Sequence, residues 1–335
     1  MENKKDLLII GAGLNGLYLA TLLQSHFNIT ILEARKRTGG RVLTTQGHDL
    51  GPSWIWPHQK HILTLIQDLG LELFSQYTKG DALYDAPEGV QRFNAPPSAP
   101  SYRVKGGLET LISSLSDKLP SAMIHTDEEV IKIQEDNDRL IASTHTKQYK
   151  SHYVISSLAP RLACKNISYE PVLDKISIKA MLQTPTWMGH SAKCVIEFET
   201  AFWKEEGLNG FIYSPLGPLG EIHDASTDTQ PALFGFLHTN ASTDNIYEDV
   251  AKQMKRLFPK QEVKKIYFID WREEKFSSSI YDKKGLSAHP EYGLNLSHFN
   301  EKMFFTGTET SYENGGYLEG AVISAKLLAQ RLLQK

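Results

Sequence analysis

Residues 7–16, which read LLIIGAGLNG, decide the fold class of this chain of 335 residues. The first four form the short apolar run of a buried parallel strand, and Gly11, Gly13 and Gly16 follow in a G-x-G-x-x-G pattern. The next residues predict a helix and then a second strand that ends at Glu33. Such glycines allow a tight turn, close approach to a pyrophosphate and helix packing, and the acid binds a ribose hydroxyl. The stretch therefore predicts a dinucleotide-binding βαβ unit.

A second segment, residues 33–42 (EARKRTGGRV), bears on which dinucleotide is bound, because NAD and FAD share the fingerprint above. A glycine pair before Arg41 allows the backbone to approach the ligand and places a guanidinium beside phosphate oxygens. The segment resembles the flavin-containing amine oxidases, the family of monoamine and polyamine oxidases. Residues 49–54 (DLGPSW) resemble that family's next flavin-contacting segment, although Pro52 stands where the family usually has a second glycine.

The C-terminal residues resemble the final motif of the same family, with Gly307-Thr-Glu309 followed by NGGYLEGA at residues 314–321. The resemblance implies that Glu309 faces the ribityl–phosphate region and that a helix opening near Tyr317 directs N–H groups at the pyrimidine end of the flavin. Two complementary halves at opposite ends of one chain favour FAD over NAD. The residues expected to bind FAD are Gly11, Gly13, Leu14, Asn15, Gly16, Glu33, Ala34, Arg35, Gly40, Arg41, Gly51, Pro52, Ser53, Trp54, Val130, Trp271, Gly307, Glu309, Gly316, Tyr317, Leu318 and Ala321.

The same resemblance implies three catalytic residues, Lys193, Tyr281 and Tyr317. Lys193 lies in a segment similar to the strand on which the family carries a lysine bonded, through water, to flavin N5. Tyr281 and Tyr317 match two aromatics that face each other in front of the flavin and hold an amine nitrogen between them. Without the resemblance, an ordinary strand lysine with its ammonium in solvent is the preferred interpretation of Lys193, and the core is the commoner place for the two tyrosines. Ile280 stands where covalent members have a cysteine, so FAD is expected to be held non-covalently.

The order of the motifs predicts an α/β fold of two domains. We expect a discontinuous FAD-binding Rossmann-like (GR2-type) domain from residues 1–57, 101–170 and 271–335. A second, α+β substrate domain of mixed sheet and helices is expected from residues 58–100 and 171–270. The segment between Trp56 and Tyr102 is much shorter than the helical insertion that helps to roof the substrate cavity in the family, so an open or differently covered site is expected.

The resemblance also implies a reaction. A hydride equivalent passes from the α-carbon of a small-molecule amine to flavin N5, water hydrolyses the imine product, and O2 or another acceptor reoxidises the flavin, with H2O2 as the product from O2. Two alternatives stay open on the same scaffold. One is a desaturase-like or protoporphyrinogen-oxidase-like flavoenzyme that acts on a substrate other than an amine, and the other is a flavin-binding protein without turnover.

Composition excludes several other classes of protein. The formal net charge is −3, with acids and bases interspersed, which gives no reason to expect a nucleic-acid partner. No window approaches the ~18–20 apolar residues of a membrane span, and no secretory signal is evident, so a cytoplasmic protein without a membrane anchor is expected. Cys164 and Cys194 are too few for a disulfide framework. His58 and His61 lack a third ligand nearby, so no metal site is expected.

Overall fold

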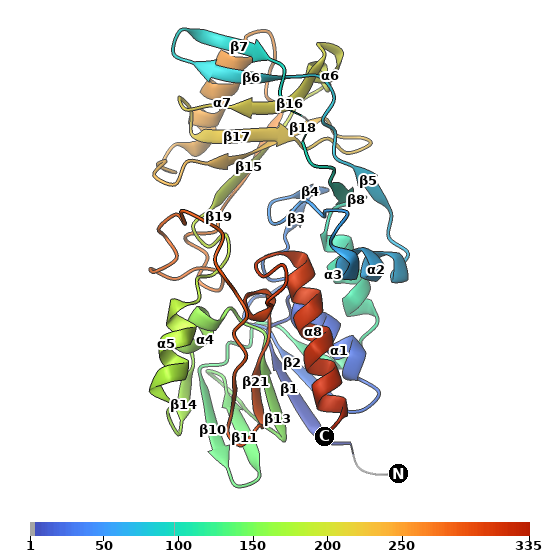
Figure 1. Ribbon diagram of the computed structural model, residues 1–335, viewed down its shortest axis with the longest axis vertical. Helices are drawn as coiled ribbons and strands as arrows, with labels where there is room; N and C mark the ends of the chain where they lie inside the picture. Colours follow the sequence, from blue (N-terminus) through green and yellow to red (C-terminus); the bar gives the residue numbers. More distant parts are fainter. Residues whose placement is uncertain (1–3, 97) are drawn as a thin grey trace.

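The computed structural model describes residues 4–96 and 98–335, and Figure 1 shows two parts that follow one another along the long axis of the molecule. The first part is built on a six-stranded sheet in which every neighbouring pair runs parallel except the edge pair. In spatial order its strands are β20 (Ser297–His298), β21 (Met303–Phe305), β13 (Tyr153–Ser156), β1 (Asp6–Ile10), β2 (Asn28–Leu32) and β9 (Ile124–His125).

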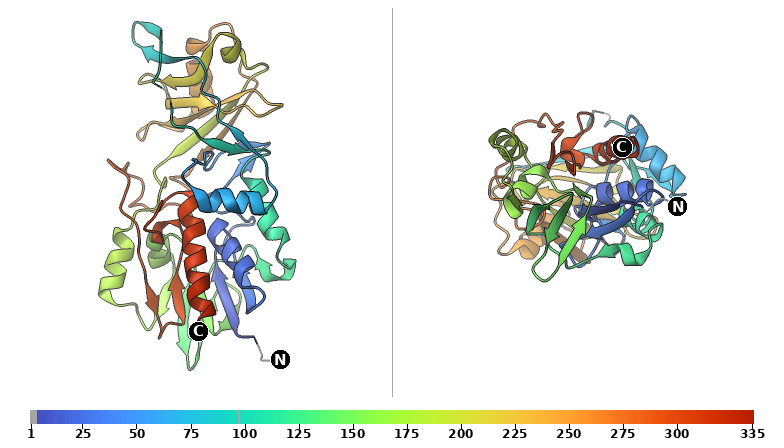
Figure 2. Two further views of the ribbon diagram at one scale, coloured as in Figure 1. Left: turned by 45° about the vertical axis from the view of Figure 1, so that its right-hand side comes forward. Right: turned by 90° about the horizontal axis from the view of Figure 1, so that it is seen from below.

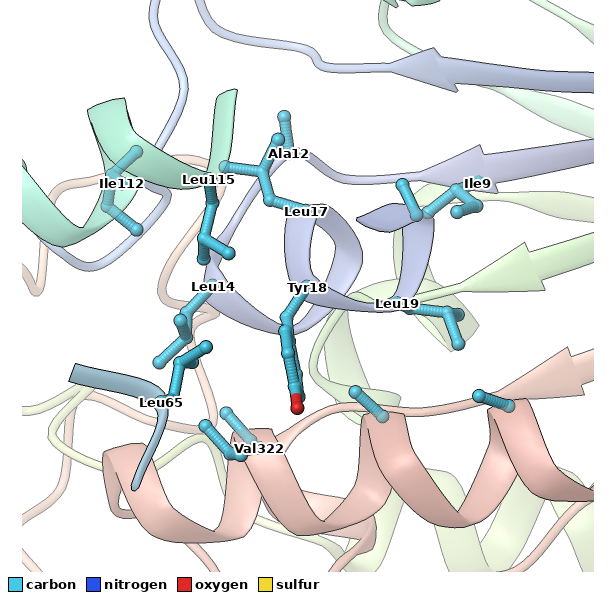
Figure 3. Packing of buried hydrophobic residues seen from close by; sticks show 14 of the residues in the cluster. Ile9, Ala12, Leu14, Leu17, Tyr18, Leu19, Leu65, Ile112, Leu115 and Val322 are labelled. Atoms are coloured by element: carbon cyan, nitrogen blue, oxygen red, sulfur yellow. The ribbon is translucent and has the colours of Figure 1, made fainter. Parts of the chain in front are cut away.

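Four helices cover one face of this sheet: α1 (Leu14–Leu23), α2 (Lys60–Asp68), α3 (Glu109–Asp117) and α8 (Leu318–Leu333). Figure 3 shows how Leu17 and Tyr18 of α1 lie between Leu115 of α3 and Val322 of α8. The contact between α1 and α8 brings the two ends of the chain together, as the paired motifs at those ends require.

The other face of the six-stranded sheet packs against a second layer of strands. Leu8 and Ile10 of β1 point to this face, whereas Leu7 and Ile9 point to the helices, the alternation expected of a strand buried on both sides. The layer is a four-stranded sheet of β12 (Gln148–Ser151), β11 (Arg139–Ser143), β10 (Lys132–Asp136) and β14 (Ser168–Glu170). Helices α4 (Pro160–Asn166) and α5 (Lys175–Gln183) pack together beside it.

The second part is a seven-stranded mixed sheet, parallel only between β16 and β6. In spatial order its strands are β19 (Lys265–Asp270), β15 (Ala192–Glu197), β18 (Ala232–Leu237), β17 (Leu219–Asp224), β16 (Leu208–Tyr213), β6 (Asp81–Ala86) and β7 (Gly89–Phe93). Helix α7 (Ile246–Leu257) covers one face with Ile246, Val250, Met254 and Leu257, the spacing of a single helical stripe, and α6 (Phe202–Glu205) lies in the same core. Figure 2 shows this sheet and α7 at the end of the molecule opposite the six-stranded sheet.

The two parts meet where short elements of the first part pack on the uncovered face of the seven-stranded sheet. Leu50 and Trp54 contact a cluster formed by Val195, Phe234 and Tyr267. The short elements nearby are β3 (Thr44–Thr45) with β4 (His48–Asp49), and β5 (Leu73–Ser75) with β8 (Tyr102–Val104). Two 3-10 turns, Ser121–Met123 and Thr308–Thr310, complete the described elements. This architecture confirms the expected Rossmann-like domain with a second domain of mixed sheet and helices.

The packing differs from the expected domain boundaries in two places. Ile62 and Leu65 of α2 lie in the core of the first part, and Met181 of α5 packs beside the four-stranded sheet. These helices carry amphipathic faces whose apolar surface is buried against the first part, whereas residues 58–100 and 171–183 were expected in the second. We therefore propose that the second domain starts after β5, near residue 76, and after α5, near residue 184.

None of the described helices has the length and apolar character that crossing a membrane requires.

Candidate active site

A cavity of about 450 Å³ follows the carboxyl ends of β1, β2, β13 and β21 and reaches the inner face of the seven-stranded sheet. Its volume lies within the range of small-molecule and cofactor sites, about 300–1,000 Å³. Every residue expected to bind FAD lines it except Gly16 and Glu309. Lys193 and Tyr317 line it as well. Segments that are far apart in the sequence therefore meet around one cavity, and they begin near residues 11, 33, 41, 51, 193, 271, 307 and 317.

The turn between β1 and α1 is shaped for close backbone approach. Gly11 has a φ of +103°, in the region that favours glycine. A Cβ on Gly16 would lie 2.1 Å from the carbonyl oxygen of Gly11, which explains why Gly16 lies behind the cavity wall and not in it. Gly13 is the N-cap of α1 and has no side chain with which to cap the first N–H groups. Those donors and the positive end of the helix dipole are left for an anionic ligand.

Glu33 joins this turn to the end of β2. The side chain is 4% exposed, and its carboxylate accepts hydrogen bonds from the backbone N–H of Ala12 at 2.8 Å and of Arg35 at 2.9 Å. Arg35 in turn donates to Glu274 at 2.7 Å and to Ser277 Oγ at 2.7 Å. These bonds hold a carboxylate at the carboxyl edge of the sheet, where it can accept a ribose hydroxyl.

Arg41 and Glu309 form a bidentate ion pair, although they lie 268 residues apart in the chain. The Arg41 Nη1 and Nη2 atoms lie 2.5 Å and 3.0 Å from the two Glu309 oxygens, and Glu309 also accepts the Trp187 N–H at 3.2 Å. Burial disfavours the charge on Arg41, but Glu309 outweighs burial and raises the pKa of Arg41 above its ordinary value. Glu309 does not line the cavity, contrary to the expectation that it faces the ribityl–phosphate region. Its full burial against Arg41 leaves it no open path to the cavity, so it positions Arg41, which does line it.

Lys193 lies on β15 with its side chain directed into the junction between the two parts. It is 2% exposed, and Nζ donates to the Gly51 carbonyl at 3.0 Å and to Ser53 Oγ at 2.6 Å. The ammonium also lies 4.1 Å from the centre of the Phe234 ring. Burial lowers the pKa of Lys193 to about 7, while Asp49 opposes this shift and Arg103 adds to it. The structure therefore excludes the alternative of a strand lysine with its ammonium in solvent.

Tyr317, the N-cap of α8, stands among aromatic rings in the cavity wall. Its ring centre is 5.6 Å from that of Trp56 and 5.9 Å from that of Trp187, and both tryptophans line the cavity. His289 stacks on Tyr317 at 5.2 Å with 3° between the ring planes. We call Trp56, Trp187 and Tyr317 the aromatic box.

Tyr281 is not part of the aromatic box, and the expectation that it faces Tyr317 is wrong. It is 60% exposed, lies beneath the Lys165 ammonium at 4.0 Å and lines a separate hollow beside α4 and α5. The cause is the next residue. Asp282 is buried and accepts hydrogen bonds from Arg161 at 2.5 Å and from the Thr186 N–H at 2.9 Å. This anchor fixes the turn with Tyr281 directed outward.

Several lining residues were missed from the sequence. Trp56 was visible only as a second tryptophan two residues after Trp54, and the spacing gave no sign that it turns toward Tyr317. Phe234 and Phe236 lie on one face of β18, and strand alternation alone leaves open which face meets the cavity. Trp187 belongs to no motif in the sequence, and the structure places it in the box.

The residues present fit FAD. The uncapped glycine turn, the buried carboxylate of Glu33 and a second helix N-terminus at Tyr317 all open onto one cavity. Asn15 also lines the cavity, and its amide nitrogen donates to the Ala321 carbonyl at 2.8 Å, so it ties the first turn of α1 to α8 beside the site.

Comparison with known proteins gives one family. The model of the family described as flavin containing amine oxidoreductase matches residues 14–101 and 97–333. Amine oxidase [flavin-containing] B of Mus musculus is 23% identical over 457 residues, which cover 99% of this chain and 87% of the relative. Amine oxidase [flavin-containing] A of Canis lupus familiaris is also 23% identical and covers 98% and 85%.

Solved structures share the fold over nearly the whole length. Cyclohexylamine oxidase from Brevibacterium oxydans superposes with a TM-score of 0.81 at 17% identity and covers 99% of this chain and 100% of its own. A putrescine oxidase bound to putrescine gives a TM-score of 0.78 at 18% identity, with coverage of 99% and 100%.

Proposed function

The chain belongs to the family of flavin containing amine oxidoreductases and is an FAD-dependent enzyme, and from this premise we propose that it oxidises a small amine with dioxygen as the electron acceptor. The observation that carries the proposal is the pairing of Lys193 with the aromatic box at one end of the cavity. A cationic nitrogen is bound favourably against aromatic faces, which supports an amine as the substrate. A chain of rings joins the two: the Lys193 ammonium lies 4.1 Å from the Phe234 ring centre, Phe234 lies 5.2 Å from Trp54, and Trp54 lies 6.3 Å from Trp56 of the box.

The cofactor would be held by the segments already described. The α1 N-terminus and Arg41 would bind its phosphates, Glu33 a ribose hydroxyl, and the α8 N-terminus the electron-accepting ring. When bound, FAD supplies a two-electron acceptor that takes a hydride equivalent from the amine's α-carbon and passes the electrons to dioxygen, with H2O2 and, after hydrolysis, an aldehyde or ketone as products. Cys194 points to the α7 side of β15 and Cys164 lies on α4, and neither lines the cavity, which supports the proposal that FAD would be held without a cysteinyl link.

Lys193 would act as a proton donor beside the reacting atoms and would hold a water there. Two of its three ammonium hydrogens go to Gly51 and Ser53, and the third is left for a water in the cavity. A pKa of about 7 lets the side chain give up or take a proton at neutral pH. Substituting methionine for Lys193 should lower turnover or flavin reoxidation at least tenfold while FAD stays bound, and unchanged turnover would remove the assigned role.

The amine must react as its free base, because only the neutral form carries the lone pair that stabilises the developing imine. The rate constant kcat/KM should therefore rise with pH toward the amine's own pKa. A kcat/KM for a simple alkylamine that stays flat from about pH 6 to 9 would contradict an amine substrate.

The decisive experiment is an absorbance spectrum of the purified protein before and after anaerobic addition of an amine panel. Flavin bands that acid precipitation releases and amines bleach are the expected result. Bands that no amine bleaches would move the substrate to another class, with the desaturase-like reaction tested next by a panel of cyclic non-amine substrates. The absence of a flavin band, even after reconstitution with FAD, would overturn the proposal as a whole.

A further inference from the structure

Residues 283–292, which we call the covering segment, lie between β19 and β20, where no described helix or strand falls (Figure 1). None of the backbone N–H or C=O groups of the covering segment is hydrogen-bonded to the backbone of another described residue. Residues 283–289 are all exposed. A segment with few backbone bonds and little burial opens locally at a low cost in free energy.

Both ends of the covering segment are fixed to the protein. At the first end, the carboxylate of the preceding residue, the buried Asp282, accepts a hydrogen bond from Arg161 at 2.5 Å. At the second end, the Tyr292 hydroxyl donates to the Pro185 carbonyl at 3.0 Å. The residues between these two points can therefore move without displacing the elements around them.

One residue of the covering segment, His289, packs against the aromatic box. Its ring stacks on Tyr317 at 5.2 Å with 3° between the planes, and its centre lies 4.5 Å from that of Trp187. Tyr292 meets the same histidine ring edge-on at 5.6 Å. Tyr317 and Trp187 line the cavity whereas His289 does not, so the histidine lies on the outer side of these two rings.

The spacing of this stack decides where an amine nitrogen can bind. Non-bonded heavy atoms approach one another to about 3.5 Å, so two parallel rings need about 7 Å between their centres to hold an atom between them. At 5.2 Å the space between His289 and Tyr317 is closed. An amine in the cavity therefore meets the other face of the Tyr317 ring, and His289 supports the ring from behind.

We propose that His289 is a positioning residue for amine binding, because its ring holds Tyr317 and Trp187 in the orientation in which they line the cavity. A binding surface keeps its geometry only where packing fixes the side chains that form it. When the covering segment moves away, both rings lose that support. The inference rests on the proposed amine oxidation and adds a residue to it. It also accounts for the short segment 57–101, since this side of the box is covered by a different part of the chain.

The first test uses trypsin, which cleaves after lysine, because Lys283 and Lys284 are both exposed within the covering segment. Cleavage at a site that must first open follows the population of the open form. We expect His289→Ala to be cut there about tenfold faster than wild type, and His289→Phe within twofold of wild type, because a phenyl ring can stack in the same place. His26→Ala, at an exposed histidine between α1 and β2, is the control and should leave the rate unchanged.

Mass spectrometry of the fragments identifies the site of the cut. Equal rates in wild type and His289→Ala would overturn the inference, because the histidine would then not hold the covering segment in place. Tyr317→Ala should also speed the cut, and its effect should not multiply with that of His289→Ala in the double variant, since both substitutions remove the same contact. Effects that multiply fully would mean that the two rings act independently, which contradicts the inference. These rates require no turnover.

The second test connects the covering segment with the reaction. His289→Ala should raise KM for a simple alkylamine about fivefold and change kcat, counted per bound flavin, less than twofold, because Lys193 is untouched. His289→Phe should restore KM, which a general loss of structure would not allow. An unchanged KM in His289→Ala would overturn the inference while amine oxidation stands. Failure of every amine to bleach the flavin of the wild type would overturn the proposed function, and the inference with it, whatever the trypsin rates.

Discussion

The two ends of the cavity are built by different means. At the cofactor end the backbone sets the shape: glycines at 11, 16 and 51 stand where a Cβ would strike another backbone atom or where φ is positive. At the amine end side chains from separate elements set the shape, with Lys193 from β15, Trp56 from a loop and Tyr317 from the start of α8. The comparison teaches that local sequence motifs can predict a binding surface formed by the backbone. A surface formed by side chains depends on how distant elements pack, which local motifs do not predict.

The largest effect should come from a Cβ added at the cofactor end. In Gly16→Ala the new carbon would lie 2.1 Å from the Gly11 carbonyl oxygen, and neither backbone segment can move without distorting the turn. We expect a loss of about 3 kcal/mol of unfolding free energy, measured by urea denaturation, and a protein that no longer retains FAD.

Gly13→Ala provides the matched control. The nearest atom to its Cβ would be the Gly39 carbonyl oxygen at 3.9 Å, so the fold should lose about 1 kcal/mol or less while the affinity for FAD falls. If Gly16→Ala kept both its stability and its flavin, the backbone would not define this end of the cavity as argued.

The same contrast explains what sequence could predict. Gly11, Glu33 and Arg41 were identified from the motif residues next to them in the chain, and the structure places all three in the cavity wall. The ion pair between Arg41 and Glu309 was not visible in the sequence, because its two partners lie 268 residues apart. The position of α2 was misjudged because an amphipathic helix shows that it has a buried face but not which core receives it.

At the amine end, the burial of the Lys193 ammonium lowers the unfolding free energy of the protein. An unfolded lysine keeps its ordinary pKa of 10.5, whereas burial lowers the value in the folded protein to about 7. Between these two values the unfolded chain binds the extra proton, so stability rises with pH from about 7 to about 10 and the full penalty is present below 7. Lys193→Met should therefore raise the unfolding free energy by about 2 kcal/mol at pH 7, after the lost bonds to Gly51 and Ser53 are set against it.

The measurement is urea denaturation of FAD-loaded wild type and Lys193→Met at pH 6.5, 8 and 9.5. The advantage of the variant should shrink as pH rises, because the wild-type penalty fades. Lys265→Met, at an exposed lysine on the neighbouring strand, should show no such trend. If the difference in unfolding free energy between wild type and Lys193→Met stayed constant across this pH range, the pKa of Lys193 would not be lowered by burial in the folded protein.

The smallest effect is expected at the position where the motif and the structure disagree. Matching motifs located Tyr281 at the family's spacing, yet the Asp282 anchor turns its ring outward onto Lys165. Tyr281→Ala should change kcat/KM less than twofold and remove only an exposed cation–π contact of about 0.5 kcal/mol. Tyr317→Ala, by comparison, removes one wall of the aromatic box and should raise KM for the amine several-fold.

Measured together, Tyr281→Ala and Tyr317→Ala test whether the spacing of motif residues in the sequence is enough to identify a catalytic residue. If Tyr281→Ala matched the loss in Tyr317→Ala, the turn held by Asp282 would have to reopen when substrate binds, and Asp282→Asn would then be expected to raise activity by loosening it. If only Tyr317→Ala loses activity, the second wall of the site is supplied by Trp56 and Trp187. Trp187 lies in the segment that joins α5 of the first part to β15 of the second, and Trp56 lies in the loop before α2. Tertiary packing, which no local motif records, brings both to Tyr317.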